Sequence, residues 1–192
     1  MNTKRILIVY GTRYGQTAKI AHHIADRLRT PDTTVSLCNA DMLPRDFSLS
    51  GFDRVIVGGS IIRGRHQRCL LRFVQTYCDQ LNTMPTAFFS VSGSAASASE
   101  TGRAEARRML MAFLTDTGWH PAVTQTIGGA MAFTKYNPLL RWVLKRISMK
   151  EGGPTDTSRD HELTDWAQVD RFAGDFATLT TRPMVETLTL EA

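Results

Sequence analysis

A short run of hydroxyl-bearing and glycine residues, Gly11–Thr17 (Gly-Thr-Arg-Tyr-Gly-Gln-Thr), stands where an apolar run stops and a helical pattern starts. Residues 6–10 are mostly β-branched or leucine, and apolar residues then recur about every fourth position from Thr17 to Leu28. Such a loop lies at a helix N-terminus, where free backbone N–H groups and the helix dipole favour an anion. The hydroxyl groups of Thr12 and Thr17 add donors, so the loop predicts a bound phosphate; the alternative is an ordinary turn with a capping threonine.

The kind of phosphate follows from what the loop lacks. Gln16 occupies the position that lysine holds in nucleoside-triphosphate loops, and the glycine spacing differs from G-x-G-x-x-G. A receiver domain would carry paired acids where this chain has Gly11 and Thr12. Residues 12–17 resemble the T-x-T-G-x-T phosphate loop of flavodoxins, with Tyr14 in place of the middle threonine. The resemblance implies FMN as the ligand, contacted by Thr12, Arg13, Tyr14, Gly15, Gln16 and Thr17.

Strands and helices alternate along the chain, which indicates a parallel sheet with helices on both faces. The expected strands are Arg5–Tyr10, Thr34–Asn39, Arg54–Gly58, Thr86–Val91 and Ala122–Gly128. The expected helices are Gln16–Arg29, Gln67–Leu81, Arg103–Thr117 and Trp166–Leu179, and the segments Ala40–Gly51 and Gly59–His66 are expected as loops. We therefore predict a three-layer α/β fold of the flavodoxin type.

Five parallel strands joined by right-handed crossovers give the order 2-1-3-4-5. A ligand then lies beyond the carboxyl ends of strands one, three and four, where three glycine- or hydroxyl-bearing loops meet. The alternative is that loops of α/β folds are rich in glycine in any case. The second and third loops are expected to supply further FMN contacts: Ser60, Ile61, Ile62, Arg63, Phe89, Ser90, Val91, Ser92 and Gly93.

Residues 60–63 and 92–94 contain no aromatic side chain, whereas flavodoxin loops usually cover the flavin with aromatic rings. We expect one flavin face to be open, which suits hydride transfer with a bound organic molecule better than electron shuttling. Hydride transfer to the flavin needs no nucleophilic side chain, so we assign no catalytic residue. Arg63, Arg65 and His66 are expected to meet a substrate carboxylate; the alternative is a solvated basic rim.

Length and composition fit one domain, which we place at residues 1–181, with a C-terminal tail at 182–192. No apolar run is long enough to span a membrane. Cys38, Cys69 and Cys78 form no C-x-x-C pair, and the five histidines form no cluster of metal-ligand spacing. We expect reduced cysteines, as in a cytosolic protein, and no metal.

The net charge of +5 departs from the acidic character of electron-carrier flavodoxins. A basic surface suits an anionic partner, which can be a lipid surface, a substrate with carboxylates or nucleic acid. Only the position of the basic residues decides among these partners.

A segment at about 131–165, between the fifth strand and the last helix, exceeds what a minimal flavodoxin needs. Within it, Lys135–Lys150 carries no acidic residue, and Pro138 is suited to the first turn of a helix. The expected apolar face consists of Leu139, Leu140, Val143, Leu144 and Ile147, and the opposite face of Arg141, Lys145 and Ser148.

That pattern is typical of an interfacial helix on an anionic membrane, with Arg141, Trp142, Lys145 and Arg146 on the membrane or quinone side. The alternative is a helix docked on the domain with an exposed basic face. Nucleic acid is not expected, because the basic residues belong to an apolar helix without a recognised binding motif.

Five segments together carry a resemblance to a known family: Gly11–Thr17, Val57–His66, Met84–Val91, Gly128–Ala130 and Gly152–Thr157. They resemble the flavodoxin-like, menaquinone-dependent protoporphyrinogen IX dehydrogenases of bacterial haem synthesis, over nearly the whole chain except the tail. The sequence departs from that family after Val91, where Ser92–Ala95 replaces a more polar and basic continuation.

The resemblance implies an FMN enzyme attached peripherally to the inner face of the cell membrane. Protoporphyrinogen IX would be oxidised in two-electron steps, and the electrons would pass to menaquinone or ubiquinone. Asp156 and Thr157, within Gly152–Thr157, are expected to close over the flavin; the alternative is that they cap a turn. The propionate groups of the substrate suit a basic rim, and a lipid-soluble acceptor suits an interfacial helix. Whether the protein forms a homo-oligomer stays an open question.

Three other functions remain open at this point. A flavodoxin-like quinone reductase would take electrons from NAD(P)H, an electron-carrier flavodoxin would dock on protein partners, and a membrane-associating module would have lost FMN. The first is distinguished by flavin reduction with NADPH, and the last by a colourless protein that does not take up FMN.

Overall fold

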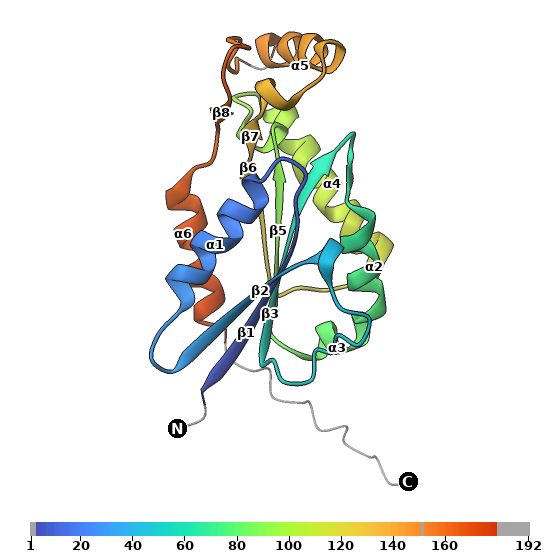
Figure 1. The fold of residues 1–192 in the computed structure, drawn as a ribbon, viewed down its shortest axis with the longest axis vertical. Helices are drawn as coiled ribbons and strands as arrows, with labels where there is room; N and C mark the ends of the chain where they lie inside the picture. Colours follow the sequence, from blue (N-terminus) through green and yellow to red (C-terminus); the bar gives the residue numbers. More distant parts are fainter. Residues whose placement is uncertain (1–2, 151, 180–192) are drawn as a thin grey trace, which may run out of the picture.

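A computed structural model describes residues 3–150 and 152–179 and shows a parallel sheet between two layers of helices (Figure 1). The parallel strands lie in the order β2-β1-β3-β5-β6. Their bounds are β1 Lys4–Gly11, β2 Thr33–Asn39, β3 Arg54–Ile62, β5 Thr86–Ser92 and β6 Val123–Gly128. Because β4, Arg65–His66, is a short antiparallel arm beside β3, this is the predicted order 2-1-3-4-5. The predicted flavodoxin-like fold class is confirmed.

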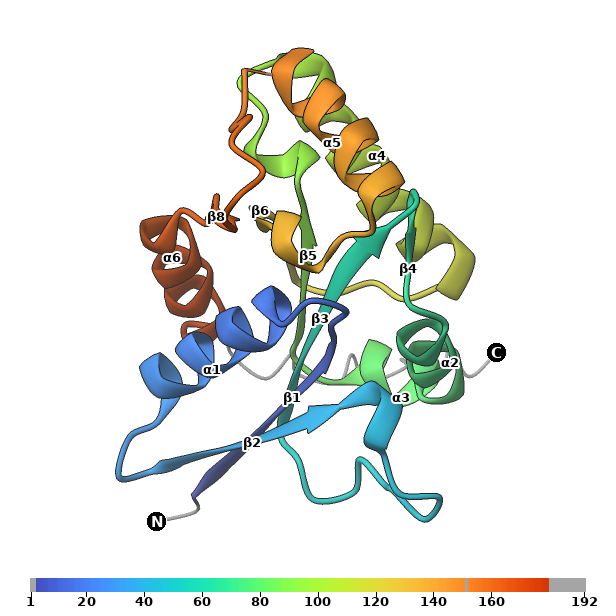
Figure 2. The ribbon, with the colours of Figure 1, turned by 45° about the horizontal axis from the view of Figure 1, so that its top comes forward.

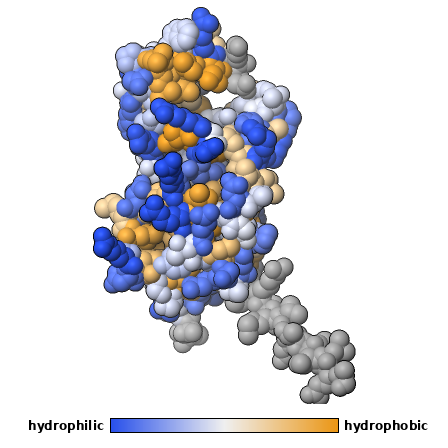
Figure 3. Space-filling model, turned by 90° about the vertical axis from the view of Figure 1, so that its right-hand side faces the viewer, coloured by the Kyte–Doolittle hydropathy of each residue, from blue (hydrophilic) through white to orange (hydrophobic). Residues whose placement is uncertain are grey.

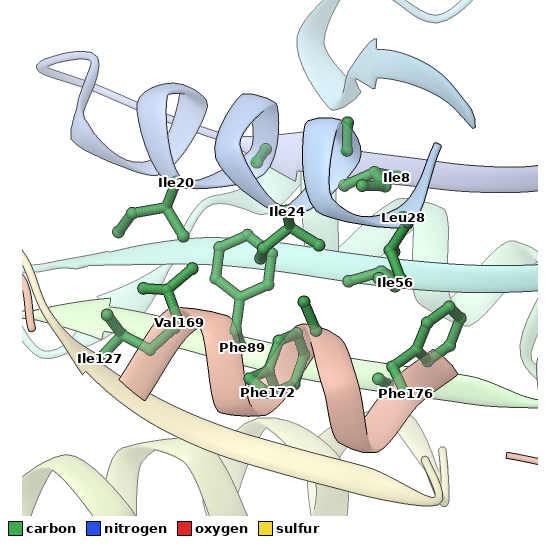
Figure 4. Close-up of a cluster of buried hydrophobic side chains, with 14 of the residues drawn as sticks. Ile8, Ile20, Ile24, Leu28, Ile56, Phe89, Ile127, Val169, Phe172 and Phe176 are labelled. Carbon is green, nitrogen blue, oxygen red and sulfur yellow. The ribbon is translucent and has the colours of Figure 1, made fainter. Parts of the chain in front are cut away.

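The helices cover both faces of the sheet (Figure 1). Helices α1 (Gln16–Leu28) and α6 (Trp166–Ala177) cover one face, and α2 (Arg68–Thr76), α3 (Cys78–Thr83) and α4 (Glu100–Thr117) cover the other. Alternate residues of β1 supply the two cores, since Ile6 and Ile8 pack toward α1 while Leu7 and Val9 pack toward α2. Figure 4 shows the first core, where α1 and α6 meet over the central strands.

The segment predicted as a loop at Gly59–His66 is instead a β-hairpin. Strand β3 continues to Ile62 and turns back into β4, with Ile62 paired to Arg65. Arg63 and Gly64, the two turn residues, have φ values of +52° and +78°. Positive φ at both positions matches the twist of the strands, although arginine rarely adopts it. The usual sequence signal for this turn, Asn-Gly, is missing, so the hairpin was not predicted.

The helix predicted at Gln67–Leu81 is interrupted at Tyr77, which separates α2 from α3. The Tyr77 hydroxyl donates to the Phe47 carbonyl oxygen over 2.6 Å, so a tertiary contact accompanies the break. Helix α4 begins at Glu100 rather than at Arg103. The other strand and helix ends shift by one or two residues, and the tail at 182–192 lies outside the described residues.

The extra segment leaves and rejoins the fold at one place. Strand β7, Ala130–Met131, pairs antiparallel with β8, His161–Glu162. Between them lie the short 3-10 helix η3, Phe133–Lys135, and helix α5, Pro138–Lys150. Figures 1 and 2 show α5 beyond the carboxyl edge of the sheet and next to the first part of α4.

The predicted faces of α5 are partly wrong. Leu140 and Leu144 pack inward on a small cluster with Phe133 and Tyr136, whereas Leu139 is 73% exposed. Ser148, expected on the outer face, is buried and donates to the Pro154 carbonyl oxygen over 2.6 Å. The apolar residues of α5 therefore divide between an inner and an outer face.

Candidate functional site

The loop between β1 and α1 has the geometry of an anion site. Gly15 precedes α1 with φ +98°, a left-handed conformation that side chains disfavour, and its N–H donates to the Thr12 Oγ1 over 3.0 Å. Thr17, in the first turn of α1, is only 1% exposed, and its Oγ1 has no hydrogen-bond partner among the described residues. A buried hydroxyl without a partner is costly, so this loop fits a phosphate that accepts from Thr17.

A cavity of about 950 Å³ joins this loop to the other predicted loops and to the extra segment. Most of the predicted FMN residues line it: Thr12, Arg13, Tyr14, Gln16, Thr17, Ser60, Ile61, Ile62, Arg63, Val91, Ser92 and Gly93. Gly15 lines a smaller neighbouring cavity of about 350 Å³ together with Tyr14 and Gln16. The topology thus brings three separate loops to one site, as the strand order requires.

Three of the predicted FMN residues lie elsewhere. Phe89 is fully buried in the sheet, and a Cβ on Gly58 would lie 2.0 Å from its ring. Ser90 is buried and lies 2.9 Å from the His66 Nε2. Asp156 is exposed, and hydrogen bonds from Ser158 hold the pKa of its carboxyl below the usual range. None of the three lines the cavity, and their contacts with FMN stay predictions.

His66 is half-buried and packs against aromatic rings. Its Nε2 is 2.9 Å from the Ser90 Oγ, and its ring packs between Phe88 and Phe113. Burial lowers the pKa of the His66 imidazole to about 4, so the ring is neutral at pH 7. His66 does not line the cavity, and its contact with a substrate carboxylate stays a prediction.

The two arginines of the hairpin differ in position. Arg63 lines the cavity from the turn, whereas Arg65 is exposed and is not among the lining residues. The pairing of β3 with β4 separates them, because the turn residue reaches the cavity and its neighbour belongs to the outer arm. Arg63 therefore lies at the cavity and Arg65 outside it, and the contact of either residue with a substrate carboxylate stays a prediction.

Sequence reasoning missed Gln67 at the start of α2. Its Nε2 donates to the Ser60 Oγ, and its Oε1 is buried without a partner among the described residues. The side chain lies over Gly11, where a Cβ would be 2.9 Å from Oε1. Gln67 also lines the cavity, so it offers a bound molecule a carbonyl acceptor. No sequence signal marked it, because its position depends on the hairpin.

The extra segment is docked on the phosphate loop. The rings of Tyr14 and Tyr136 meet edge to face at 5.1 Å, and the Lys135 Nζ donates to the Tyr14 carbonyl oxygen over 3.1 Å. On the other side of the loop, the Gln16 Nε2 donates to the Thr164 Oγ1 over 2.9 Å. Tyr14, which departs from the flavodoxin threonine, therefore serves as the contact point for the segment.

Within residues 3–150 and 152–179, no group of three or more His, Cys, Asp or Glu side chains is arranged to hold a metal ion. In the same residues, no helix is both long and apolar enough to cross a membrane. All three cysteines are free.

Comparison with known proteins identifies the family. Residues 7–158 match the family model of the flavodoxin domain. The protoporphyrinogen IX dehydrogenase (quinone) of Escherichia coli (strain K12) is 32% identical over 182 residues, which are 95% of this chain and 99% of that protein. The chain belongs to this dehydrogenase family. A protein of the same name from Leishmania major is 31% identical and aligns with 91% of this chain and 75% of its own length.

Solved structures support the fold of this family member. Oxidised flavodoxin 1 from Bacillus cereus superposes with a TM-score of 0.56 at 16% identity, covering 92% of this chain and 100% of the flavodoxin. The apo form of the NADH:FMN oxidoreductase EMOB gives a TM-score of 0.54 at 15% identity, and the superposition covers 94% of this chain and 92% of the oxidoreductase. At these identities the likeness concerns the fold alone.

The chain is therefore a flavodoxin-type oxidoreductase, and the predicted cofactor, FMN, is confirmed at the level of the family. The unpartnered Thr17 hydroxyl and the left-handed Gly15 fit its phosphate. FMN, when bound, supplies the ability to accept a hydride and to pass electrons on.

Proposed function

We propose that this protein oxidises protoporphyrinogen IX to protoporphyrin IX in haem biosynthesis and passes the electrons to a membrane quinone, menaquinone or ubiquinone. The observation that carries the proposal is a cavity of about 950 Å³ that is lined both by the phosphate loop and by α5. A simple electron carrier needs only a flavin site, whereas a dehydrogenase must hold a second molecule against it. The names of the E. coli and Leishmania relatives support the choice of substrate and acceptor.

The residues divide the work between cofactor and substrate. The Thr12 and Thr17 hydroxyls and the first N–H groups of α1 hold the phosphate of FMN. Ser60 and Gln67, which are hydrogen-bonded to each other, orient the bound molecules from the side of β3. Arg13 and Arg63, both exposed and both lining the cavity, pair with propionate carboxylates.

The proposed oxidation needs no nucleophilic side chain. Ser92 and Gly93 present small groups at the end of β5, so a flat substrate can approach the site closely. Oxidation then requires orientation of the substrate and removal of protons to water or to a nearby acceptor, rather than a covalent intermediate. We therefore assign positioning roles and no catalytic side chain.

We further propose that α5 attaches the protein peripherally to the anionic inner face of the cell membrane. Trp142 and Met149, on the outer face of α5, are 56% and 61% exposed. Figure 3 shows the apolar area at the top of the molecule, where Figure 1 places α5. The Arg146 guanidinium lies 4.7 Å from the Trp142 ring, so positive charge borders the apolar surface.

Anaerobic mixing of FMN-loaded protein with protoporphyrinogen IX tests the reaction. We expect rapid loss of the oxidised-flavin absorbance with the porphyrinogen, and recovery of the absorbance when a quinone is added. Fast bleaching by NADPH, with none by protoporphyrinogen, would instead show an NAD(P)H:quinone reductase. Complementation of a bacterial strain that lacks protoporphyrinogen oxidation places the reaction in haem synthesis.

A further inference from the structure

One part of the cavity is lined from α5 and from the side of α4, and we call it the α4–α5 arm. Figures 1 and 2 show the first part of α4 close to α5. The residues that define the arm are Ala96, Ala98, Met109, Leu140, Leu144 and Ile147. We infer that this arm binds the uncharged, planar ring of the quinone acceptor beside FMN. This inference rests on the proposed function and assigns its acceptor a place.

The volume of the cavity is the first reason to place the quinone ring in the arm. Cavities that hold one drug-sized ligand range from about 300 to about 1,000 Å³. The cavity of about 950 Å³ lies at the upper end of that range. Its lining also changes character, from hydroxyl groups and backbone at the phosphate loop to aliphatic and thioether groups in the arm. One amphipathic cofactor does not match both parts, whereas a cofactor with an apolar neighbour does.

Charge is the second reason, because it separates the two candidate occupants. Arg13 and Arg63 line the cavity from the phosphate loop and the hairpin turn, where a dicarboxylate finds cations. The charged residue that lines the cavity from α4 is Glu105, which pairs with Arg108 over 2.6 Å. An anionic porphyrinogen is therefore directed to the arginine end, and an uncharged quinone ring to the arm.

The third reason is that the arm is accessible from the outer face of α5. Ile147 lines the cavity and is also 51% exposed, so it lies at the rim between the arm and the outer face of α5. On that outer face, Val143 and Trp142 continue the apolar surface. A lipid-soluble molecule can thus pass from the membrane to the arm along apolar side chains. On arrival the quinone takes up two electrons and two protons from reduced FMN and leaves as the quinol.

Two substitutions fill the arm from opposite sides, Leu144→Trp on α5 and Met109→Trp on α4. The matched control is Met111→Trp, because Met111 is on the same helix as Met109, is 57% exposed and does not line the cavity. The FMN-loaded proteins are photoreduced without oxygen and reoxidised with menadione, a naphthoquinone without a lipid tail. Ferricyanide, a small hydrophilic oxidant, serves as the second acceptor, and menadione binding to the oxidised proteins is measured by equilibrium dialysis.

We expect both arm variants to lose at least about tenfold in menadione reoxidation and binding, a loss worth about 1.4 kcal/mol. FMN affinity and ferricyanide reoxidation should stay at the wild-type level, as should every measurement on Met111→Trp. Ile147→Asp provides a test that does not depend on tolerance of a larger core residue. A carboxylate at the rim should weaken menadione binding by a similar factor without changing the melting temperature.

Wild-type menadione kinetics in all arm variants would overturn the inference. It would also be overturned by variants that keep menadione reoxidation but are no longer reduced by protoporphyrinogen, because the arm would then belong to the porphyrinogen. If menadione reoxidises the wild-type protein through the arm while protoporphyrinogen fails to reduce it, the arm stands and the proposed substrate is wrong.

Discussion

At the residue scale, the Thr17 hydroxyl shows how an unsatisfied group indicates a ligand. It is buried in the first turn of α1 and has no partner among the described residues. In the protein without cofactor this hydroxyl only costs stability, whereas a phosphate oxygen satisfies it. Its two effects are therefore opposite in sign and can be separated by experiment.

We predict that Thr17→Val, which removes the hydroxyl and keeps the shape, weakens FMN binding by about 10- to 100-fold. The melting temperature without FMN should stay constant or rise, because no hydrogen bond is lost. Fluorescence titration of FMN and thermal unfolding check the two parts. Thr17→Ser is the control and should keep the affinity; unchanged affinity in Thr17→Val would reject the phosphate assignment.

The half-buried His66 makes stability depend on pH. Its folded pKa of about 4 lies below the ordinary value of 6.5, so the unfolded chain takes up a proton first as pH falls. The free energy of unfolding is therefore unaffected by His66 above about pH 6.5 and falls by about 3 kcal/mol as pH approaches 4.

We predict that His66→Gln flattens this dependence while keeping a polar partner for Ser90. Denaturant unfolding at a series of pH values between about 7 and 4 measures the slope. His120→Gln is the control, because His120 is exposed and should leave the slope unchanged. The assignment fails if the two variants show the same slope as the wild-type protein.

Arg63 holds a backbone conformation that arginine disfavours, at φ +52°, while its side chain borders the cavity. Asparagine tolerates that conformation better, so Arg63→Asn should raise the free energy of unfolding by up to about 1 kcal/mol. The same change removes a cation and should raise KM for protoporphyrinogen several-fold. Arg65→Asn, in the outer arm of the hairpin, should change neither quantity. An unchanged KM in Arg63→Asn would show that Arg63 is only a turn residue.

The predicted site residues that line the cavity have positions set by local structure. Thr12 follows β1, Thr17 lies in the first turn of α1 and Ser92 ends β5, so the pattern of strands and helices brings them to the carboxyl edge. Gln67 and Met109 reach the cavity through the hairpin and the helix on the other face of the sheet. The positions of these two side chains depend on contacts between distant segments, and hydrophobic periodicity does not predict such contacts.

At the element scale, the same distinction holds. The sequence predicts the five parallel strands within a few residues. Strands β1, β3 and β5 are rich in apolar residues, whereas β2 and β6 alternate apolar with polar residues. The hairpin was missed because Arg63-Gly64 lacks the common turn signal, and the break between α2 and α3 because Tyr77 is held by a distant carbonyl. For α5, the sequence pattern predicts one apolar face, whereas in the structure the apolar residues lie on two faces.

The structure sharpens which basic residues of α5 can act at a membrane. Arg141 is half-buried, and its guanidinium donates to the Tyr136 carbonyl oxygen over 3.2 Å, so it supports the fold of the segment. Lys145 and Arg146 are exposed. A test of membrane binding should therefore change the latter two and leave Arg141 in place.

We predict that Lys145→Glu with Arg146→Glu weakens binding to anionic vesicles by about 30-fold or more, because each basic residue contributes about 1 kcal/mol. FMN content should not change. Arg68→Glu with Arg72→Glu, on the exposed side of α2, alters the net charge equally and is the control. Vesicle co-sedimentation measures both. Equal losses in the two double variants would assign the effect to net charge rather than to α5.

At the scale of the whole molecule, the extra segment leaves and rejoins the flavodoxin core at one place and also contacts the phosphate loop. Met131 and His161 are directly paired across β7 and β8, although 30 positions separate them in sequence order. The side chains of Phe133 and Tyr136 form a cluster of their own, apart from the two cores on the sheet. The core should therefore fold without the segment.

We predict that replacing residues 132–160 by Asn-Gly, a two-residue turn suited to an antiparallel pair, leaves a cooperatively folded domain that still binds FMN. Vesicle binding and menadione reoxidation should be lost together, because both are assigned to α5. Circular dichroism and FMN titration check the fold, and a chain that unfolds without a cooperative transition would contradict the prediction.

The position of α6 has a consequence for how the protein is made. Val169, Phe172 and Phe176 of α6 fill the core above β5 and β6 (Figure 4), and Arg54 at the start of β3 donates to the Phe176 and Ala177 carbonyl oxygens. Translation proceeds from the N-terminus, so of the described elements this helix is synthesised last. Until it emerges from the ribosome, one face of the sheet stays open to water, and any nascent chain that stalls before residue 177 presents an incomplete apolar surface to chaperones and proteases.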